Sequence, residues 1–118
     1  MVERSVTAPG DTGRRFRRFV WEGLKQGDTG QSVSVPGVTS MYFQVIGVTG
    51  IVAIEGSLEE IADADNFFLM DDHSAMPMYL TRGQGRAVPF PGVMHVRPRV
   101  DTGDEDTDFT VILFTRSN

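Results

Sequence analysis

The sequence predicts an all-β fold, an antiparallel β-sandwich or jelly roll that follows an extended N-terminal arm. Roughly eight short segments rich in β-branched and aromatic residues are separated by turns that contain Gly and Pro, a pattern typical of such sandwiches. Strands do not alternate with long helical patterns, so a parallel α/β sheet is not expected. The 118 residues suffice for one hydrophobic core, and we expect an arm at residues 1–15 and a single β-sandwich domain at residues 16–118.

The sequence of residues 1–35 predicts the arm, a strand, a turn and a second, short strand. Residues 1–15 lack hydrophobic periodicity and contain one Pro and two Gly, so we expect an extended segment that becomes ordered on a partner. Residues 16–21 are β-prone, with Phe19 and Trp21 on one face. A turn at residues 26–30 and a short strand at residues 32–35 follow, because Gly and Asp supply the backbone angles that turns require.

The strongest β pattern lies in residues 41–56. Successive side chains of residues 41–46 alternate between the two faces of a strand, and a second apolar run begins at Ile51. A short connection that contains Gly47 and Gly50 separates the two runs, which predicts a hairpin. Because almost every position is apolar, β-branched or aromatic, we expect this hairpin to be central and covered.

The second half of the chain predicts one short helix and then further strands. Ser57 followed by Glu60 is a helix N-capping pattern, which predicts one or two helical turns at residues 57–64. Pro98 predicts that its strand lies at a sheet edge or ends there. The strands expected after Gly56 cover residues 66–70, 76–81, 93–100 and 109–115, with a flexible loop at 83–86 and an acidic hairpin loop at 101–108.

Composition describes an ordinary folded domain. Hydrophobic residues make up 40% of the chain and charged residues 23%, which is unlike a disordered segment. The chain has no cysteine, so disulfides and thiolate metal sites are excluded. No apolar run approaches the length that spans a bilayer, and the N-terminus lacks a signal-peptide core. We therefore expect no membrane association, and synthesis in the cytoplasm.

Charge is distributed unevenly along the chain. Residues 1–25 carry six basic and three acidic residues, a net +3, whereas the remainder carries five basic and thirteen acidic residues, a net −8. A basic arm on an acidic body predicts an electrostatic contact with another surface, while solvated arginines would give the same count. The sequence pI of about 4.8 argues against a nucleic-acid partner, since such domains are usually basic.

No catalytic centre is expected. The triplet Asp-Thr-Gly, which carries the catalytic aspartate in pepsin-like proteases, begins at Asp11, Asp28 and Asp101. That chemistry needs two aspartates side by side after apolar strands, whereas two of these copies sit in turn-rich sequence. Neither His73 nor His95 has a nucleophile motif beside it. We therefore expect a protein that is not an enzyme.

Metal and cofactor sites have equally weak support. Residues 104–108 place carboxylates at alternate positions like the start of a calcium loop, but the later Gly and bidentate Glu are missing. An exposed acidic turn is the favoured interpretation, and weak binding of a divalent ion remains open. Residues 71–73 offer too few ligands for a zinc site. The glycines at 83 and 85 are not followed by the Lys-Ser/Thr and helix of a phosphate loop. We expect no cofactor.

Several short motifs resemble small virion proteins of tailed bacteriophages. They are Trp-Glu-Gly-Leu at 21–24, Gly-Asp-Thr-Gly at 27–30, Pro-Gly at 36–37, Phe-Gln-Val at 43–45, Val-Ala-Ile-Glu-Gly-Ser at 52–57 and Val-Arg-Pro at 96–98. The resemblance covers about residues 21–115. It departs after Ser57, where a short polar turn leading to Trp would be expected, and residues 1–20 have no counterpart.

The resemblance implies a β-sandwich or jelly-roll head decoration protein, also called a cement protein. Such a protein clamps adjacent major capsid subunits on the virion surface, often as a trimer at three-fold positions. We therefore expect the major capsid protein and further copies of this chain as partners. A neck or tail protein of the same virion and a carbohydrate-binding β-sandwich module are the alternatives.

The expected partner-binding residues lie at the N-terminal end. In this hypothesis the cationic side chains contact acidic residues of the shell, and two aromatic side chains act as apolar anchors. The set consists of Arg14, Arg15, Phe16, Arg17, Arg18 and Trp21.

Overall fold

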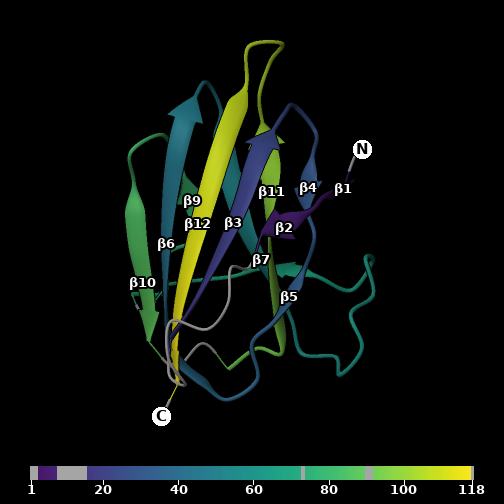
Figure 1. Cartoon of the computed structure of the whole chain (residues 1–118), viewed down its shortest axis with the longest axis vertical. Coiled ribbons are helices and arrows are strands. Elements are labelled where there is room, and N and C mark those ends of the chain that lie inside the picture. The colour runs from purple at the N-terminus through teal and green to yellow at the C-terminus, as the bar shows by residue number, and fades with distance from the viewer. Residues whose placement is uncertain (1–2, 8–15, 73, 90–91, 118) are drawn as a thin grey trace.

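The computed structural model describes residues 3–7, 16–72, 74–89 and 92–117, and it consists of two β-sheets packed face to face. Sheet A has the order β1-β4-β11-β7-β8, with β5 also paired to β11 and β9 to β7. Sheet B has the order β10-β6-β12-β3-β2 and forms the front layer in Figure 1. The all-β sandwich expected from the sequence is confirmed.

The strands of sheet A are β1 (Glu3–Arg4), β4 (Thr29–Gly30), β5 (Val33–Ser34), β7 (Ile51–Ser57), β8 (Phe68–Leu69), β9 (Tyr79–Leu80) and β11 (His95–Thr102). The strands of sheet B are β2 (Val6–Thr7), β3 (Phe16–Leu24), β6 (Val38–Val48), β10 (Gly85–Pro89) and β12 (Asp108–Ser117). In the described part of the chain no helix is long and apolar enough to cross a membrane.

The core lies between the sheets and is built from one face of each long strand. Alternate residues are buried at positions 41, 43 and 45 of β6 and at 109, 111, 113 and 115 of β12, as period-two patterning requires for a sheet with one covered face. The largest fully buried side chains belong to Trp21, Phe43, Phe109, Leu24, Met41, Ile54, Met78, Leu80 and Leu113. These side chains fill the space between the two layers.

The hairpin expected in residues 41–56 is wrong, because its two strands lie in opposite sheets. β6 pairs with β10 and β12 in sheet B, whereas β7 pairs with β11, β8 and β9 in sheet A. The connection turns out of one layer and into the other through Thr49 and Gly50, which have positive φ angles of 49° and 124°. Only β7 is covered on both faces; β6 leaves one face exposed.

Three other expectations are corrected. Residues 58–66 form a loop and not helical turns, because Ser57 still belongs to β7. Gly85 and Arg86, expected in a flexible loop at residues 83–86, instead begin the edge strand β10. The acidic residues after Thr102 do not close a hairpin, since β11 and β12 lie in different sheets.

Pro98 lies in a central strand and not at the expected edge. β7 pairs with one side of β11 along its length, while the other side meets two short strands, β5 at His95 and Val96 and β4 at Arg99. Pro98 lies between these two short strands. The N–H that proline lacks would therefore have no strand partner on this side. Gly30 packs on this proline, and a Cβ at Gly30 would lie 2.7 Å from Pro98 Cδ.

The described part of the N-terminal arm, residues 3–7, packs against the sandwich of the same molecule. β1 pairs in parallel with β4, and β2 pairs antiparallel with β3. Arg4 Nε lies 2.6 Å from Oδ2 of Asp28, a buried carboxylate that also accepts a hydrogen bond from Lys25 N. Residues 3–7 are thus part of both sheets, whereas residues 8–15 lie outside the described residues.

Candidate interaction surfaces

The structure separates the side chains that the sequence groups as partner-binding. Phe16 and Arg18 point outward from β3, and Arg17 belongs to the opposite side of the strand. Trp21 is completely buried and its Nε1 donates a hydrogen bond to the carbonyl oxygen of Gln31 at 2.8 Å. Trp21 therefore cannot touch a partner in this fold. Arg14 and Arg15 lie outside the described residues.

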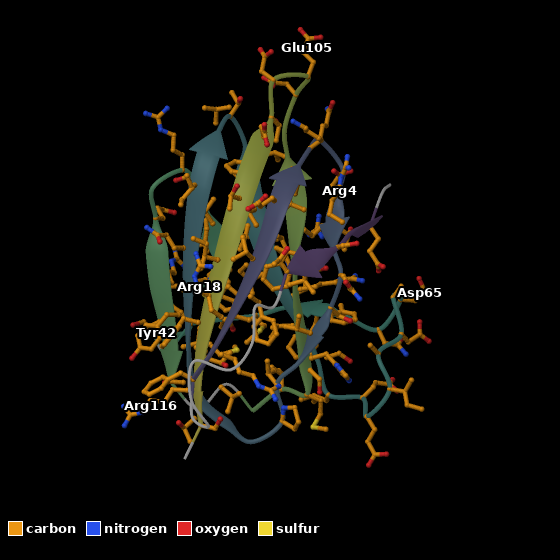
Figure 2. All side chains as sticks on the ribbon, viewed as in Figure 1. Arg4, Arg18, Tyr42, Asp65, Glu105 and Arg116 are labelled. Atoms are coloured by element: carbon orange, nitrogen blue, oxygen red, sulfur yellow. The ribbon has the colours of Figure 1, made fainter. Side chains whose placement is uncertain are left out.

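Phe16 and Arg18 belong to a larger surface on sheet B, which we call the apolar–arginine face. Its residues are Phe16, Arg18, Tyr42, Ile46, Ile112, Phe114 and Arg116. Register places Tyr42 opposite Phe114, and Phe114 opposite Arg18, across three adjacent strands. The rings of Phe16 and Phe114 stack with centroids 5.5 Å apart. Figure 2 labels Arg18, Tyr42 and Arg116 of this surface.

Large apolar side chains on this face are open to solvent. Tyr42 is 49% exposed and Ile46 is 48% exposed, although both lie within a long strand. Among the described residues, the side chains of Arg18 and Arg116 form no ion pair, and both are exposed. A contiguous apolar surface with unpaired cations is typical of a protein–protein contact.

The residues predicted from the sequence leave out five members of this face: Tyr42, Ile46, Ile112, Phe114 and Arg116. The alternation in residues 41–46 already indicates that Tyr42 and Ile46 point away from Met41, Phe43 and Val45. The alternation does not indicate whether the outer side of β6 is exposed, because that depends on whether other segments of the chain pack against it.

The outer side of β7 in sheet A is covered, in contrast to that of β6 in sheet B. The outward side chains of Ala53, Glu55 and Ser57 on β7 are all buried. Glu55 accepts a hydrogen bond from Arg97 Nε on one oxygen and from Arg99 Nε on the other, each at 3.0 Å. A buried carboxylate is tolerated here because two guanidinium groups compensate its charge.

Arg97 and His95 on β11 attach the loop that follows β7, residues 58–67, to the outer side of sheet A. The guanidinium group of Arg97 lies 4.0 Å from the centroid of the Phe67 ring, and Arg97 also donates a hydrogen bond to the carbonyl oxygen of Ala64 at 3.1 Å. His95 Nε2 lies 3.0 Å from the carbonyl oxygen of Glu60. These contacts hold residues 58–67 against sheet A.

Neighbouring carboxylates raise the pKa of Arg99 on this face. Burial alone would lower the pKa of Arg99, but hydrogen bonds and Coulombic attraction from Glu55 and Asp101 outweigh it and raise that pKa above its ordinary value. Arg99 therefore stays charged at any pH near neutrality, and its pairing with Glu55 persists there.

The outside of this loop forms a second surface, the acidic loop, defined as residues 58–66. Leu58 is 65% exposed and Ile61 is 82% exposed. Between and after them lie the exposed acidic residues Glu59, Glu60, Asp63 and Asp65. The loop therefore presents apolar side chains among carboxylates, while its base is fixed to the sheet.

Neither a cluster of metal ligands nor a catalytic pair of Asp-Thr-Gly triplets is found among the described residues. No group of three or more His, Asp or Glu side chains in this part of the chain is placed to hold a metal ion. Asp28 is engaged by Arg4, and Asp101 is paired with Arg99, so these two Asp-Thr-Gly triplets do not form a catalytic pair. Asp11 lies outside the described residues.

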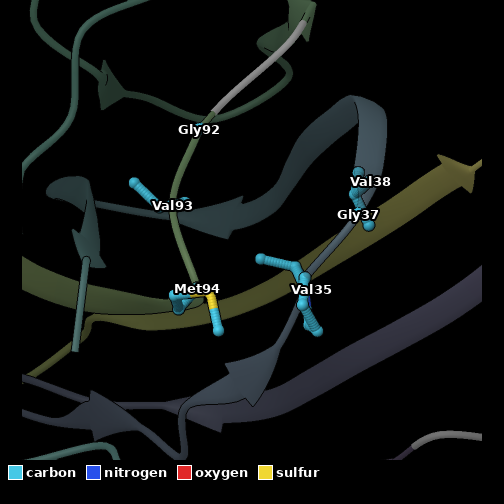
Figure 3. A pocket seen from close by; sticks show the side chains of 7 residues that line it. Val35, Gly37, Val38, Gly92, Val93 and Met94 are labelled. Carbon is cyan, nitrogen blue, oxygen red and sulfur yellow. The ribbon is translucent and has the colours of Figure 1, made fainter. Parts of the chain in front are cut away.

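A pocket of about 340 Å³ lies at one end of the sandwich, between residues 35–38 and 92–94 (Figure 3). Its described lining consists of Val35, Pro36, Gly37, Val38, Gly92, Val93 and Met94. None of these side chains can donate a proton, act as a nucleophile or hold a charge. The described lining of this pocket therefore contains no side chain that could take part in acid–base or nucleophilic catalysis.

Solved structures share this fold. SPBc2 prophage-derived protein YomS is similar with a TM-score of 0.62 and 11% identity, covering 92% of this chain and 100% of that chain. An RmlC-like cupin protein from Desulfovibrio desulfuricans has a TM-score of 0.51 and 13% identity, covering 94% of this chain and 79% of that chain. The Schizosaccharomyces pombe Cnp3 cupin domain matches with a TM-score of 0.51 and 8% identity, covering 96% and 60%.

No protein-family model and no curated protein sequence matches this chain. Identities this low show the fold alone. The chain is thus a jelly-roll β-sandwich of the kind found in cupins and in a prophage-derived protein.

Proposed function

We propose that this chain is a structural protein of a tailed-phage virion that decorates the capsid, where it binds the major capsid protein and associates with further copies of itself. The observation that carries this proposal is the apolar–arginine face, an exposed surface on the outer side of sheet B. Water contact with Tyr42, Ile46 and Phe114 is unfavourable, so covering the face with protein stabilises an assembly.

Two further observations support an assembly role over catalysis. The space between the sheets is filled by apolar side chains, and the described lining of the pocket between residues 35–38 and 92–94 carries no reactive group. The fold also matches a prophage-derived protein along that protein's whole length. A decoration protein needs stable surface area and not an active site.

The shell contact in this proposal lies at the start of β3. Arg14 and Arg15 directly precede Phe16 in sequence, and Arg17 is exposed on the side of the strand opposite the apolar–arginine face. These cations would meet acidic residues of the major capsid protein on the virion surface. Copies bound to neighbouring capsid subunits would then clamp them together, as a trimer at three-fold positions.

The test of the proposed function is the copy number of this polypeptide in purified phage particles. Quantitative mass spectrometry against the major capsid protein measures it. We expect copies comparable to the capsid subunit. About a dozen copies would instead indicate a neck or tail protein. Absence from the particle would refute a virion role.

The shell contact is tested by adding purified protein to capsids that lack it. We expect Arg14→Glu combined with Arg15→Glu to weaken capsid binding, with Arg82→Glu as the control for a charge reversal at an exposed turn. Deleting residues 2–18 is unsuitable, because it would remove β1 and β2 and the first residues of β3. Equal binding by both variants would contradict the assigned contact.

A further inference from the structure

Two exposed surfaces of this molecule have complementary chemistry. The apolar–arginine face combines Tyr42, Ile46 and Phe114 with the cations of Arg18 and Arg116. The acidic loop combines Leu58 and Ile61 with four carboxylates. Figure 2 places Arg18, Tyr42 and Arg116 on one side of the view and Asp65 on the other, so one molecule cannot join its own two surfaces.

The apolar–arginine face does not suit pairing with the same face of a second copy. A two-fold contact centred there would bring Arg18 and Arg116 of one copy close to the same arginines of the other. Like charges brought together in an interface strongly disfavour association. The face therefore selects an occupant that is both apolar and acidic.

The acidic loop meets this requirement and is already shaped for contact. Its base is tied to sheet A by Arg97, which donates to the Ala64 carbonyl oxygen, and by His95 at the Glu60 carbonyl oxygen. Asn66 Nδ2 also donates a hydrogen bond to Glu59 Oε1 at 2.9 Å. A loop fixed in this way loses less conformational entropy on binding than a free one.

We propose that copies of this chain associate head to tail, with the acidic loop of one copy seated on the apolar–arginine face of the next. Ile61 and Leu58 pack on Tyr42, Ile46 and Phe114 of the neighbour, and the loop carboxylates pair with its Arg18 and Arg116. The inference names the interface of the self-association in the proposed function and rests on that part of it.

The geometry of this contact determines the kind of oligomer. Because the two surfaces differ, the interface is heterologous, and such an interface closes into a ring or extends into a chain. A stable contact covers about 800 Å² on each partner, roughly a tenth of the surface of a small protein. The total accessible surface of 6603 Å² is large enough for each copy to use both surfaces at once.

The test compares charge reversals on the two surfaces by sedimentation velocity of the full chain over a range of concentrations. The face variant carries Arg18→Glu and Arg116→Glu, and the loop variant carries Glu60→Lys and Asp65→Lys. The side chains of all four residues are exposed, so circular dichroism should report the wild-type fold. Arg82→Glu and Glu105→Lys are controls at exposed turns away from both surfaces.

We expect the wild-type chain to form oligomers that weaken as salt is added. Each variant should lower the association constant at least about a hundredfold. Combining the face and loop substitutions in one chain should restore part of the association, because the two new lysines of the loop attract the two new glutamates of the face. Mixing the two separate variants should give mixed oligomers in which they alternate, an outcome specific to a head-to-tail contact.

Three outcomes would overturn the inference. They are a wild-type chain that stays monomeric, oligomers that neither variant weakens, and a combined variant that stays dissociated. A monomer that binds capsids through Arg18 and Arg116 would assign the face to the shell, which overturns the inference and leaves the virion role standing. Absence from virions would refute the virion role independently of these results.

Discussion

Arg97 on β11 and Glu55 on β7 face each other in register across two antiparallel strands, and Arg97 Nε donates a hydrogen bond to Glu55 Oε1 at 3.0 Å. The same arginine reaches outward to the Ala64 carbonyl oxygen and lies over Phe67. One cross-strand pair thus joins sheet A to the base of the acidic loop. Glu55 is therefore covered on the outer side of β7, whereas Tyr42 and Ile46 on the outer side of β6 stay exposed.

We expect Glu55→Gln to lower the free energy of unfolding by about 2–3 kcal/mol. Removing one partner of a fully buried pair costs about 3–5 kcal/mol, and the side chain of Arg99 is 29% exposed, which reduces the penalty. Urea denaturation measures the change. Glu105→Gln, at an exposed turn, is the control and should leave the midpoint unchanged. Equal midpoints for the two variants would mean that the buried pair does not stabilise the fold.

The sequence predicts the strands of this protein better than their partners. Nearly every long strand lies where hydrophobic periodicity indicates, because burial of one face leaves a local mark. The hairpin expected between residues 41 and 56 is wrong because a short Gly-containing connection can either fold a strand back on itself or carry it into the facing sheet. Pairing depends on β12, more than fifty residues away in sequence.

The candidate surfaces show the same limit. Phe16 and Arg18 were expected to face a partner, and they lie on an exposed face. Trp21 shares their strand and their β-prone pattern, but its alternate position turns it into the core. The exposed acidic loop was expected as helical turns, since a capping pattern is local and cannot report that Ser57 is already paired with His95 in sheet A.

We expect Gly30→Ala to destabilise the fold by more than about 2 kcal/mol, because overpacking forces rigid neighbours to move. A Cβ at this position would lie 2.7 Å from the Pro98 ring and from Trp21 Cδ1, and neither ring can turn away easily. Thermal unfolding measures the loss. Gly85→Ala is the matched control, since its Cβ would meet only the Phe43 carbonyl oxygen at 3.4 Å. Similar melting temperatures for the two variants would contradict this packing.

We expect Arg4→Ala to loosen the N-terminal segment without unfolding the sandwich. The substitution leaves the buried Asp28 carboxylate with the Lys25 amide but without its cation, which should cost about 1 kcal/mol because Arg4 is partly exposed. Hydrogen exchange locates the effect. The amide of Gln31, which donates to the Arg4 carbonyl oxygen, should exchange faster, whereas amides of β12 should not. Uniform acceleration, or none, would show that Arg4 does not hold this segment.

We expect Trp21→Phe to reduce stability without affecting contacts with other proteins. The chain has one Trp, and its buried indole should emit at short wavelength and shift to longer wavelength when urea unfolds the protein. Replacing it leaves a cavity and removes the hydrogen bond to the Gln31 carbonyl oxygen, which together should cost about 2–4 kcal/mol. Phe19→Leu, another buried change on the same strand, is the control for a general loss of packing. Because Trp21 has no exposed surface, the folded Trp21→Phe variant should bind capsids and copies of itself as the wild-type chain does. A loss of binding in a variant that remains folded would instead place Trp21 at a contact that this fold does not expose.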